Sequence, residues 1–315
     1  SSAYLNPANG LLDYNKTSFN FSFSSCRWLP NLTSDVYLRY YAFNYARQLK
    51  GLFPNKPLQL FFRYHLTNFD VGEQIGMDEY GNPTSNWDSF MNAHSFTVGL
   101  RKHSTYKFIH PLSLGYDISA AGSYKLIRQK MTDVVVGEEG HTGIFNHHLF
   151  DLGILTSGIL ELPLSIYNIK YSPSIGFSKS NIGDDLTLID ITQADPPPTI
   201  SRLGYSNIFS IVRKNWTIFR IGFGKSASDL LTGRAQSDSP PYYINTYDDN
   251  PLGDIDIKKH IIENNYDESI YSVNKGREIN FFDIIILNCG KIVQEGYTAP
   301  LIINTSGYSL FSKGL

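Results

Sequence analysis

The sequence is poor in charge and in cysteine, and it has no long hydrophobic run. Only 18% of its 315 residues are charged, against roughly 25% in soluble domains. The formal net charge is −2 and no element carries a cluster of Lys and Arg, so nucleic acid is not an expected partner. Cys26 and Cys289 stand far apart without a CxxC spacing, which favours packed thiols over a metal or redox motif.

The lack of a long apolar run argues against a transmembrane helix. It does not argue against a β-barrel that spans a membrane. The most apolar stretch, around 281–287, is interrupted by Asp283 and is far shorter than the ~18 residues of a spanning helix. Barrel strands need only about 9 to 11 residues, and their alternating pattern produces no such run. The chain opens at Ser1 without a signal-peptide pattern, so we expect a mature or already trimmed chain.

What the sequence does contain is alternation with a period of two, which is clearest in 56–69. One set of alternate positions there is apolar: Leu58, Leu60, Phe62, Tyr64 and Leu66. The other set is more polar: Gln59, Phe61, Arg63, His65 and Thr67. Because successive side chains of a strand point to opposite faces, this stretch predicts a long strand with one apolar face. Such a strand fits a half-solvated soluble sheet, or a barrel with lipid outside and a wet lumen inside.

The lengths of the connections between strands favour the barrel. About twelve strands follow one another, and the connections between them alternate between long and short. We expect long loops at 70–89, 128–148, 184–198 and 228–275. Outer-membrane barrels sort their connections in this way, with short periplasmic turns and long extracellular loops. The pattern therefore predicts one all-β domain over 1–315, a transmembrane antiparallel β-barrel that crosses the membrane many times.

Six short segments stand out as a set. They are Ser2 to Ala8 (SAYLNPA), Trp28 to Leu32, Phe61 to Tyr64, Ser180 to Gly183, Arg202 to Gly204 and Glu278 to Gly290. Together, in this order, they resemble the PorV/PorQ family of Bacteroidota outer-membrane proteins. The resemblance implies a FadL-like barrel of about 14 strands with a short N-terminal segment in the lumen. Residues 1–16 would then form the lumenal segment and 17–315 the barrel, which would lack its N-terminal start and its last hairpin.

The resemblance also implies a function. Members of this family belong to the type IX secretion system of the bacterial outer membrane, where they lie beside the large translocon barrel. They receive secreted cargo proteins through the cargo's C-terminal signal domain and pass them to the surface attachment machinery. We therefore expect the translocon barrel, cargo proteins and outer-membrane lipids as partners, with no cofactor and no enzymatic activity. The residues do not separate the main cargo shuttle from a paralogue with another partner.

Seven polar residues fall on the strand faces that we assign to the lumen: Arg39, Arg63, His65, Asp117, Glu161, Arg202 and Arg220. They could line a polar channel or a ligand path. They could also pair with one another and with the N-terminal segment, and so fill the interior. An inward orientation is expected in either case, because a charge that faces lipid near the midplane costs ~2–4 kcal/mol.

The long segments carry candidate contacts for partners. Five aromatic residues are expected to be exposed there: Tyr80, Trp87, Tyr242, Tyr243 and Tyr247. Exposed aromatic side chains of this kind anchor interfaces. His141, His147 and His148 could suit a metal by residue type, but a loop does not hold ligands at fixed distances, so we predict no metal site. No nucleophile–base pair or phosphate-binding loop stands out.

A second hypothesis is a FadL-like outer-membrane transporter of a hydrophobic small molecule. It predicts a continuous apolar pocket in the lumen and a kink or gap in the wall. The secretion hypothesis predicts instead a filled lumen below loops that bind protein partners.

Overall fold

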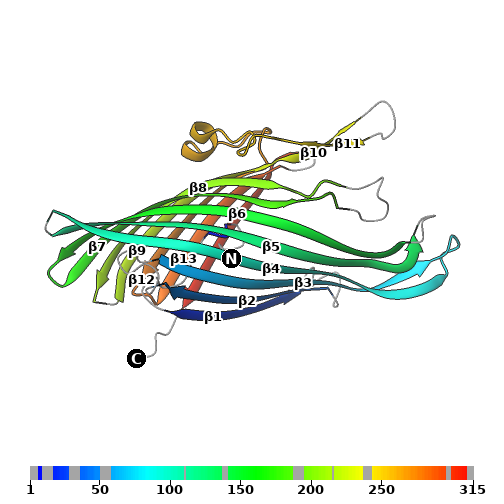
Figure 1. Ribbon diagram of the computed structural model, residues 1–315, viewed down its shortest axis with the longest axis horizontal. Helices are drawn as coiled ribbons and strands as arrows, with labels where there is room; N and C mark the ends of the chain where they lie inside the picture. Colours follow the sequence, from blue (N-terminus) through cyan, green and yellow to red (C-terminus); the bar gives the residue numbers. More distant parts are fainter. Residues whose placement is uncertain are drawn as a thin grey trace.

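One antiparallel sheet dominates the fold. The computed structural model describes residues 6–8, 17–27, 36–49, 58–109, 111–136, 141–186, 195–214, 216–236, 243–295 and 299–310. Within these ranges, twelve strands pair in sequence order (Figure 1). They are β1 (Ser18–Arg27), β2 (Tyr37–Gln48), β3 (Leu58–Met77), β4 (Pro83–Ile109), β5 (Leu112–Val136), β6 (His141–Leu164), β7 (Tyr167–Gly183), β8 (Ile200–Arg213), β9 (Trp216–Leu230), β12 (Ser272–Phe281), β13 (Ile285–Gln294) and β14 (Leu301–Leu310).

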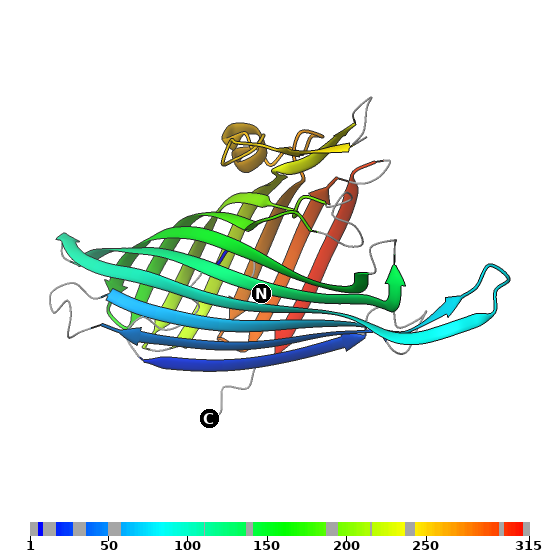
Figure 2. The same ribbon diagram turned by 45° about the vertical axis from the view of Figure 1, so that its right-hand side comes forward.

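The predicted all-β class and the count of about twelve strands are confirmed. Figure 2 shows that the sheet is strongly curved and that its strands run at a slant to one another. The first and last strands, β1 and β14, are its edges, and in the described ranges no pairing joins them. The remaining strands, β10 (Thr232–Gln236) and β11 (Tyr243–Tyr247), form a separate two-stranded ribbon.

The two faces of the sheet differ sharply in chemistry. We call the face that carries Gln59, Arg63 and His65 the inner face, and the opposite one the outer face. Cross-strand partners share a face, so the register extends this division across the sheet: Arg63 pairs with Thr97, and Thr97 pairs with Ser123. All of these polar side chains are buried.

The outer face is apolar and exposed. Large hydrophobic side chains cover it on strands from β1 to β13: Phe19, Phe21, Phe23, Leu60, Phe62, Phe96, Val98, Leu100, Ile118, Phe150, Leu152, Ile154, Ile175, Phe209, Ile221, Phe223 and Leu287. Neighbours on one strand illustrate the contrast, since the exposed fraction is 1% for Arg63 and 36% for Phe62. Charged residues are almost never fully buried unless they are paired, so the buried charges of the inner face need partners within the fold.

Two of the expected loops are strand instead. The polar stretches 70–89 and 128–148 continue as the hairpins β3–β4 and β5–β6; residues 78–82 connect β3 and β4, and residues 137–140 lie outside the described ranges. Gly72 adopts a positive φ of 80° at a register shift in the first of these hairpins. Their composition resembles that of a loop because polar residues occupy both sets of alternate positions. The connections at the opposite ends are short, for example 165–166 between β6 and β7.

A compact cap covers part of the outer face. We call residues 248–271 the cap; it contains the short π-helix η2 (Ile257–Ile262), drawn in gold in Figures 1 and 2. Ile255, Ile261 and Ile270 of the cap pack on Ala227 and Val273 of the sheet, all five fully buried. In the described part of the chain, no helix is long and apolar enough to cross a membrane.

Candidate functional site

The inner face holds a short segment from the start of the chain, Asn6 to Ala8. The side-chain amide of Asn6 donates to two backbone carbonyls, Ile154 O and Phe177 O, each at 3.2 Å. These carbonyls belong to a directly paired position of β6 and β7. The Asn6 side-chain oxygen accepts from the backbone N–H of Ala8 at 2.9 Å. The asparagine therefore fixes its own turn and ties that turn to two strands.

Two inner-face side chains from other strands bind the same segment. Arg63 on β3 donates from Nη1 to Pro7 O at 3.2 Å. The hydroxyl of Ser119 on β5 donates to Ala8 O at 2.7 Å. Ala8 is fully buried. The segment is therefore held by four strands, so that its backbone carbonyls, which would otherwise be buried without partners, are satisfied.

Glycine creates the space in which Asn6 and Pro7 lie. A Cβ atom at Gly153 on β6 would be 2.3 Å from the Asn6 side-chain oxygen and 2.8 Å from Pro7 Cδ. One at Gly176 on β7 would be 3.1 Å from the Asn6 amide nitrogen. A Cβ contact as short as that at Gly153 essentially never occurs, and the one at Gly176 would be tight, so the two glycines form a notch that the segment fills. Any larger residue at Gly153 would displace it.

Charged residues elsewhere on the inner face are paired with one another. Arg101 on β4 donates from Nε to both carboxylate oxygens of Asp117 on β5, at 2.8 Å each. His103 lies 3.8 Å from the same carboxylate. Lys125 and Asp151 form a second pair at 2.8 Å, with both side chains almost fully buried. Mutual pairing is the condition under which buried charges are tolerated.

The remaining predicted inner-face residues are also bound within the sheet. Glu161 pairs with Lys170 across β6 and β7. Arg220 lies 3.3 Å from Glu278 across β9 and β12. Arg202 donates to the Ser180 hydroxyl at 2.9 Å, and His65 is buried against the Tyr40 ring, with 5.6 Å between ring centroids. These residues are distributed around the sheet and do not converge on one centre.

Arg39 lies on the outer face. The register pairs it with Asn68, three positions from the buried inner-face pair Ala42 and His65, and an odd separation along a strand changes the face. Its guanidinium lies 5.3 Å from the Tyr37 ring centre and 3.8 Å from the Asp70 carboxylate. This differs from the inward orientation that the sequence suggested. The reason is that β2 carries aromatic residues on both faces, so alternation alone did not identify the apolar one.

The predicted contact aromatics are in different situations. Tyr80 is 81% exposed at the tip of the β3–β4 hairpin. Trp87 is half-buried and donates from Nε1 to Met131 O at 2.6 Å, so it joins the two long hairpins. Tyr242 lies outside the described residues, as does the side chain of Tyr243.

Tyr247 is exposed but already bound. Its hydroxyl donates to the Asp185 carboxylate, and this hydrogen bond raises the pKa of Tyr247 to about 12. The bond joins the β10–β11 ribbon to the connection that follows β7. Of the three candidates whose side chains are described, Tyr80 is therefore the most available to a partner.

The structure adds site residues that the sequence reasoning did not single out. The notch of Gly153 and Gly176, and the ion pair of Lys125 with Asp151, were not identified. Alternation does place Lys125 and Asp151 on the polar sets of their strands, so it could have found them. The notch could not have been found, because it depends on which part of the chain lies against these two glycines.

No protein-family model and no curated protein matches this chain. Within the described ranges, no group of three or more His, Cys, Asp or Glu side chains is arranged to hold a metal ion. The candidate site is therefore defined by its geometry alone: a polar, ion-paired inner face with the segment Asn6–Ala8 bound to it.

Proposed function

We propose that this chain is a bacterial outer-membrane β-barrel that acts without catalysis in the type IX secretion system. In this role it binds secreted cargo through the cargo's C-terminal signal domain, beside the large translocon barrel, and passes it to the surface attachment machinery. The observation that carries the membrane part of this proposal is the reversed burial pattern, with charges such as Arg63 and Asp151 buried and an apolar outer face exposed.

The energetics of the outer face support lipid as its surroundings. Apolar surface left in water costs about 25 cal/mol for each Å², and soluble monomers rarely expose apolar patches beyond a few hundred Å². Here the exposed apolar side chains run across consecutive strands, and the outer-face pair of Arg39 with Asp70 lies near the start of β2. The two edge strands, β1 and β14, support closure of the sheet into a barrel. In lipid, each unpaired backbone group at an open edge would cost several kcal/mol.

The contents of the inner face favour a protein-binding role over transport of a hydrophobic molecule. A transporter of that kind needs a continuous apolar path, whereas the described inner face presents Arg101, Asp117, Lys125 and Asp151 as ion pairs. The segment Asn6–Ala8 occupies part of it. The long hairpins beyond the sheet, with Tyr80 at one tip, provide the surface for protein partners.

Site-specific photocrosslinking in native membranes tests this proposal. A photoreactive amino acid in place of Tyr80 should capture cargo proteins or the translocon barrel. The same group in place of Ile166, which is 54% exposed at a turn at the other end of the sheet, should not. Equal capture at the two positions, or capture of neither partner at Tyr80, would overturn the cargo-binding role. Failure of the protein to float with membranes on a density gradient would overturn the membrane role.

A further inference from the structure

One sector of the outer face is basic. Lys225 on β9, Lys275 on β12 and Lys291 on β13 are direct cross-strand neighbours and form a row on that face. Arg277 lies two residues along β12 from Lys275, on the same face. Like charges directly opposite one another in a sheet are destabilising. The fold therefore places four cations where they repel one another.

These four cations have no anionic partner in the described part of the chain. Lys225 donates from Nζ to the backbone carbonyl of Ile262 in the cap at 2.5 Å, which leaves its charge unbalanced. None of the four takes part in an ion pair with a described Asp or Glu. The inner face is different, since its charges are paired. Among the described residues, no carboxylate balances the charge of the basic sector.

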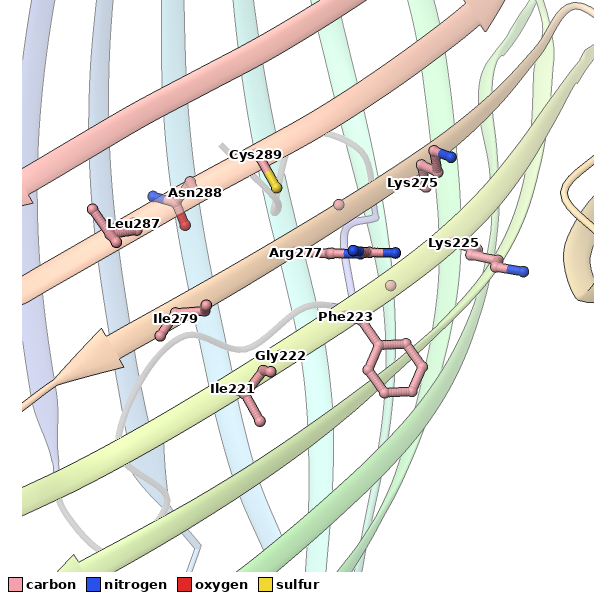
Figure 3. Close-up of a pocket in the computed structure, with 12 residues that line it drawn as sticks. Ile221, Gly222, Phe223, Lys225, Lys275, Arg277, Ile279, Leu287, Asn288 and Cys289 are labelled. Carbon is pink, nitrogen blue, oxygen red and sulfur yellow. The ribbon is translucent and has the colours of Figure 1, made fainter.

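The same sector contains a groove. It is lined by β9, β12 and β13 and has a volume of about 580 Å³, which is within the range of small-molecule sites. Figure 3 shows Lys225, Lys275 and Arg277 on one side of the groove and Ile221, Ile279 and Leu287 on the other. Gly222, Gly224 and Gly276 contribute backbone without a side chain to its floor. The groove thus has a cationic end and an apolar end.

The position of the cap indicates which end of the groove faces water. Above the basic row, Ala227 and Val273 are covered by Ile255 and Ile261 of the cap. Below it, the outer face is apolar down to Phe281. The cations therefore lie directly under the edge of a polar loop segment, at the upper limit of a short apolar belt. In a bilayer, this is where headgroups meet acyl chains.

We infer that this groove binds a membrane lipid whose headgroup carries phosphate. The phosphate lies among Lys225, Lys275 and Arg277, and the acyl chains lie along Ile221, Ile279 and Leu287. Lysine and arginine at a membrane surface attract anionic lipid, and arginine matches the geometry of phosphate oxygens. The inference rests on the proposed membrane function, because a lipid reaches the outer face only in a bilayer.

Native mass spectrometry of the full chain in neutral detergent tests the inference. The probe is phosphatidic acid, compared with phosphatidylcholine of the same acyl chains. The protein should retain phosphatidic acid, and the double variant Lys275→Gln/Arg277→Gln should bind it roughly tenfold or more weakly. The matched control Lys102→Gln/Lys179→Gln removes the same charge from the outer face of β4 and β7, outside the groove, and should bind as the parent does.

Three results would overturn the inference. Equal retention of the two lipids would remove the role of the phosphate. Equal loss in both double variants would show a general effect of charge. Displacement of phosphatidic acid by inorganic phosphate at equal concentration would show an anion site without a role for acyl chains. Flotation of the protein with liposomes tests membrane insertion separately. A protein that inserts but shows no preference between the two lipids contradicts only the lipid site, and not the proposed function.

Discussion

At the scale of single residues, the contact between Gly153 and the segment Asn6–Ala8 is the most sensitive point of the inner face. The notch has no spare room, since a Cβ at Gly153 would approach the Asn6 side chain to 2.3 Å and Pro7 to 2.8 Å. The position of the segment therefore depends on the absence of one methyl group.

We predict that Gly153→Ala expels the segment and lowers the free energy of unfolding by about 1–3 kcal/mol, the usual cost of overpacking. A cysteine introduced at Ala8 should react faster with a water-soluble maleimide in the Gly153→Ala background. The rate should rise by at least the factor by which release of the segment becomes more favourable. Gly222→Ala is the control, because a Cβ there meets its nearest neighbour, in Ile208, at 3.7 Å. Unchanged labelling in Gly153→Ala would contradict the notch.

The Arg101–Asp117 ion pair gives a second prediction at this scale. Arg101→Met leaves the Asp117 carboxylate, which is 7% exposed, without its bidentate partner. Loss of one partner of a buried pair costs about 3 kcal/mol, whereas replacing both by apolar groups is often neutral. Urea unfolding in lipid vesicles should therefore show a large loss for Arg101→Met and recovery in Arg101→Met/Asp117→Leu. If the double variant were the less stable of the two, the pair would be contributing through other contacts.

Arg39 shows what sequence can decide about a single residue. In β3 the two faces differ in composition, so alternation assigned Arg63 and His65 to the polar side, where they are buried. In β2 the outer face carries Tyr41 and Phe43, while the inner face carries Tyr40 and two small alanines. The pattern is aromatic on both sides. Only the register with β3 decides the orientation, and register is a property of two strands.

At the scale of elements, the cap depends on a small electrostatic cluster. The Asp267 carboxylate accepts from Lys259 Nζ and from the Ser269 hydroxyl, the latter at 2.6 Å. It also lies 3.3 Å from Nε2 of the buried His260. The bond from Lys259, followed by that from Ser269, lowers the pKa of Asp267 well below its usual value of 3.8. The carboxylate form is thus favoured in the folded cap.

The sign of the pH dependence follows from this shift. A carboxyl whose folded pKa is depressed contributes stability above its unfolded pKa, and this contribution is lost as pH falls towards the folded pKa. We predict that the cap is equally resistant to pepsin from pH 5 to pH 4 and becomes susceptible below about pH 3.8, where the unfolded state starts to be protonated. Cleavage rates are normalised to an unfolded reference substrate at each pH.

Asp267→Asn serves as the matched control for the cap. It lacks the titrating group, so the ratio of its cleavage rate to that of the reference should be the same at pH 5 and pH 3. An Asp267→Asn cap that kept the pH dependence of the parent would assign the effect to another carboxyl. The sheet strands should remain uncleaved in both proteins, because the cluster touches only the cap.

The strands were predicted well where one face of the strand is apolar. They were predicted poorly where neither face is apolar. The period of two located the sheet strands because a membrane-facing or core-facing side forces alternation. In 70–89 and 128–148 both sets of alternate positions contain polar residues, so the hairpins β3–β4 and β5–β6 lack that signal and their sequences resemble loops. The turn at 78–82 is held by the Asp78 carboxylate, which accepts from the backbone N–H of Tyr80 at 2.9 Å and of Asn82 at 2.8 Å. Such a local turn is compatible with either a loop or a hairpin.

At the scale of the whole molecule, the exposed apolar residues of the outer face give different expectations for substitutions in lipid and in water. A soluble sheet gains little from an exposed isoleucine and loses little when it is replaced by a charged residue. In lipid, the same replacement is costly near the midplane and becomes nearly neutral beyond the interfaces. The depth dependence of a substitution is therefore a direct test of which medium surrounds the outer face.

Ile154 and Ile75 allow this test with matched exposure. Each is 53% exposed, but Ile154 lies halfway along the apolar outer face of β6, whereas Ile75 lies on the part of β3 that projects as a hairpin. We predict that Ile154→Arg lowers the free energy of unfolding in phospholipid vesicles by about 2–4 kcal/mol, and that Ile75→Arg changes it by less than about 1 kcal/mol. Urea titration followed by tryptophan fluorescence measures both. Equal effects of the two substitutions would mean that water, and not lipid, surrounds the outer face of this sheet.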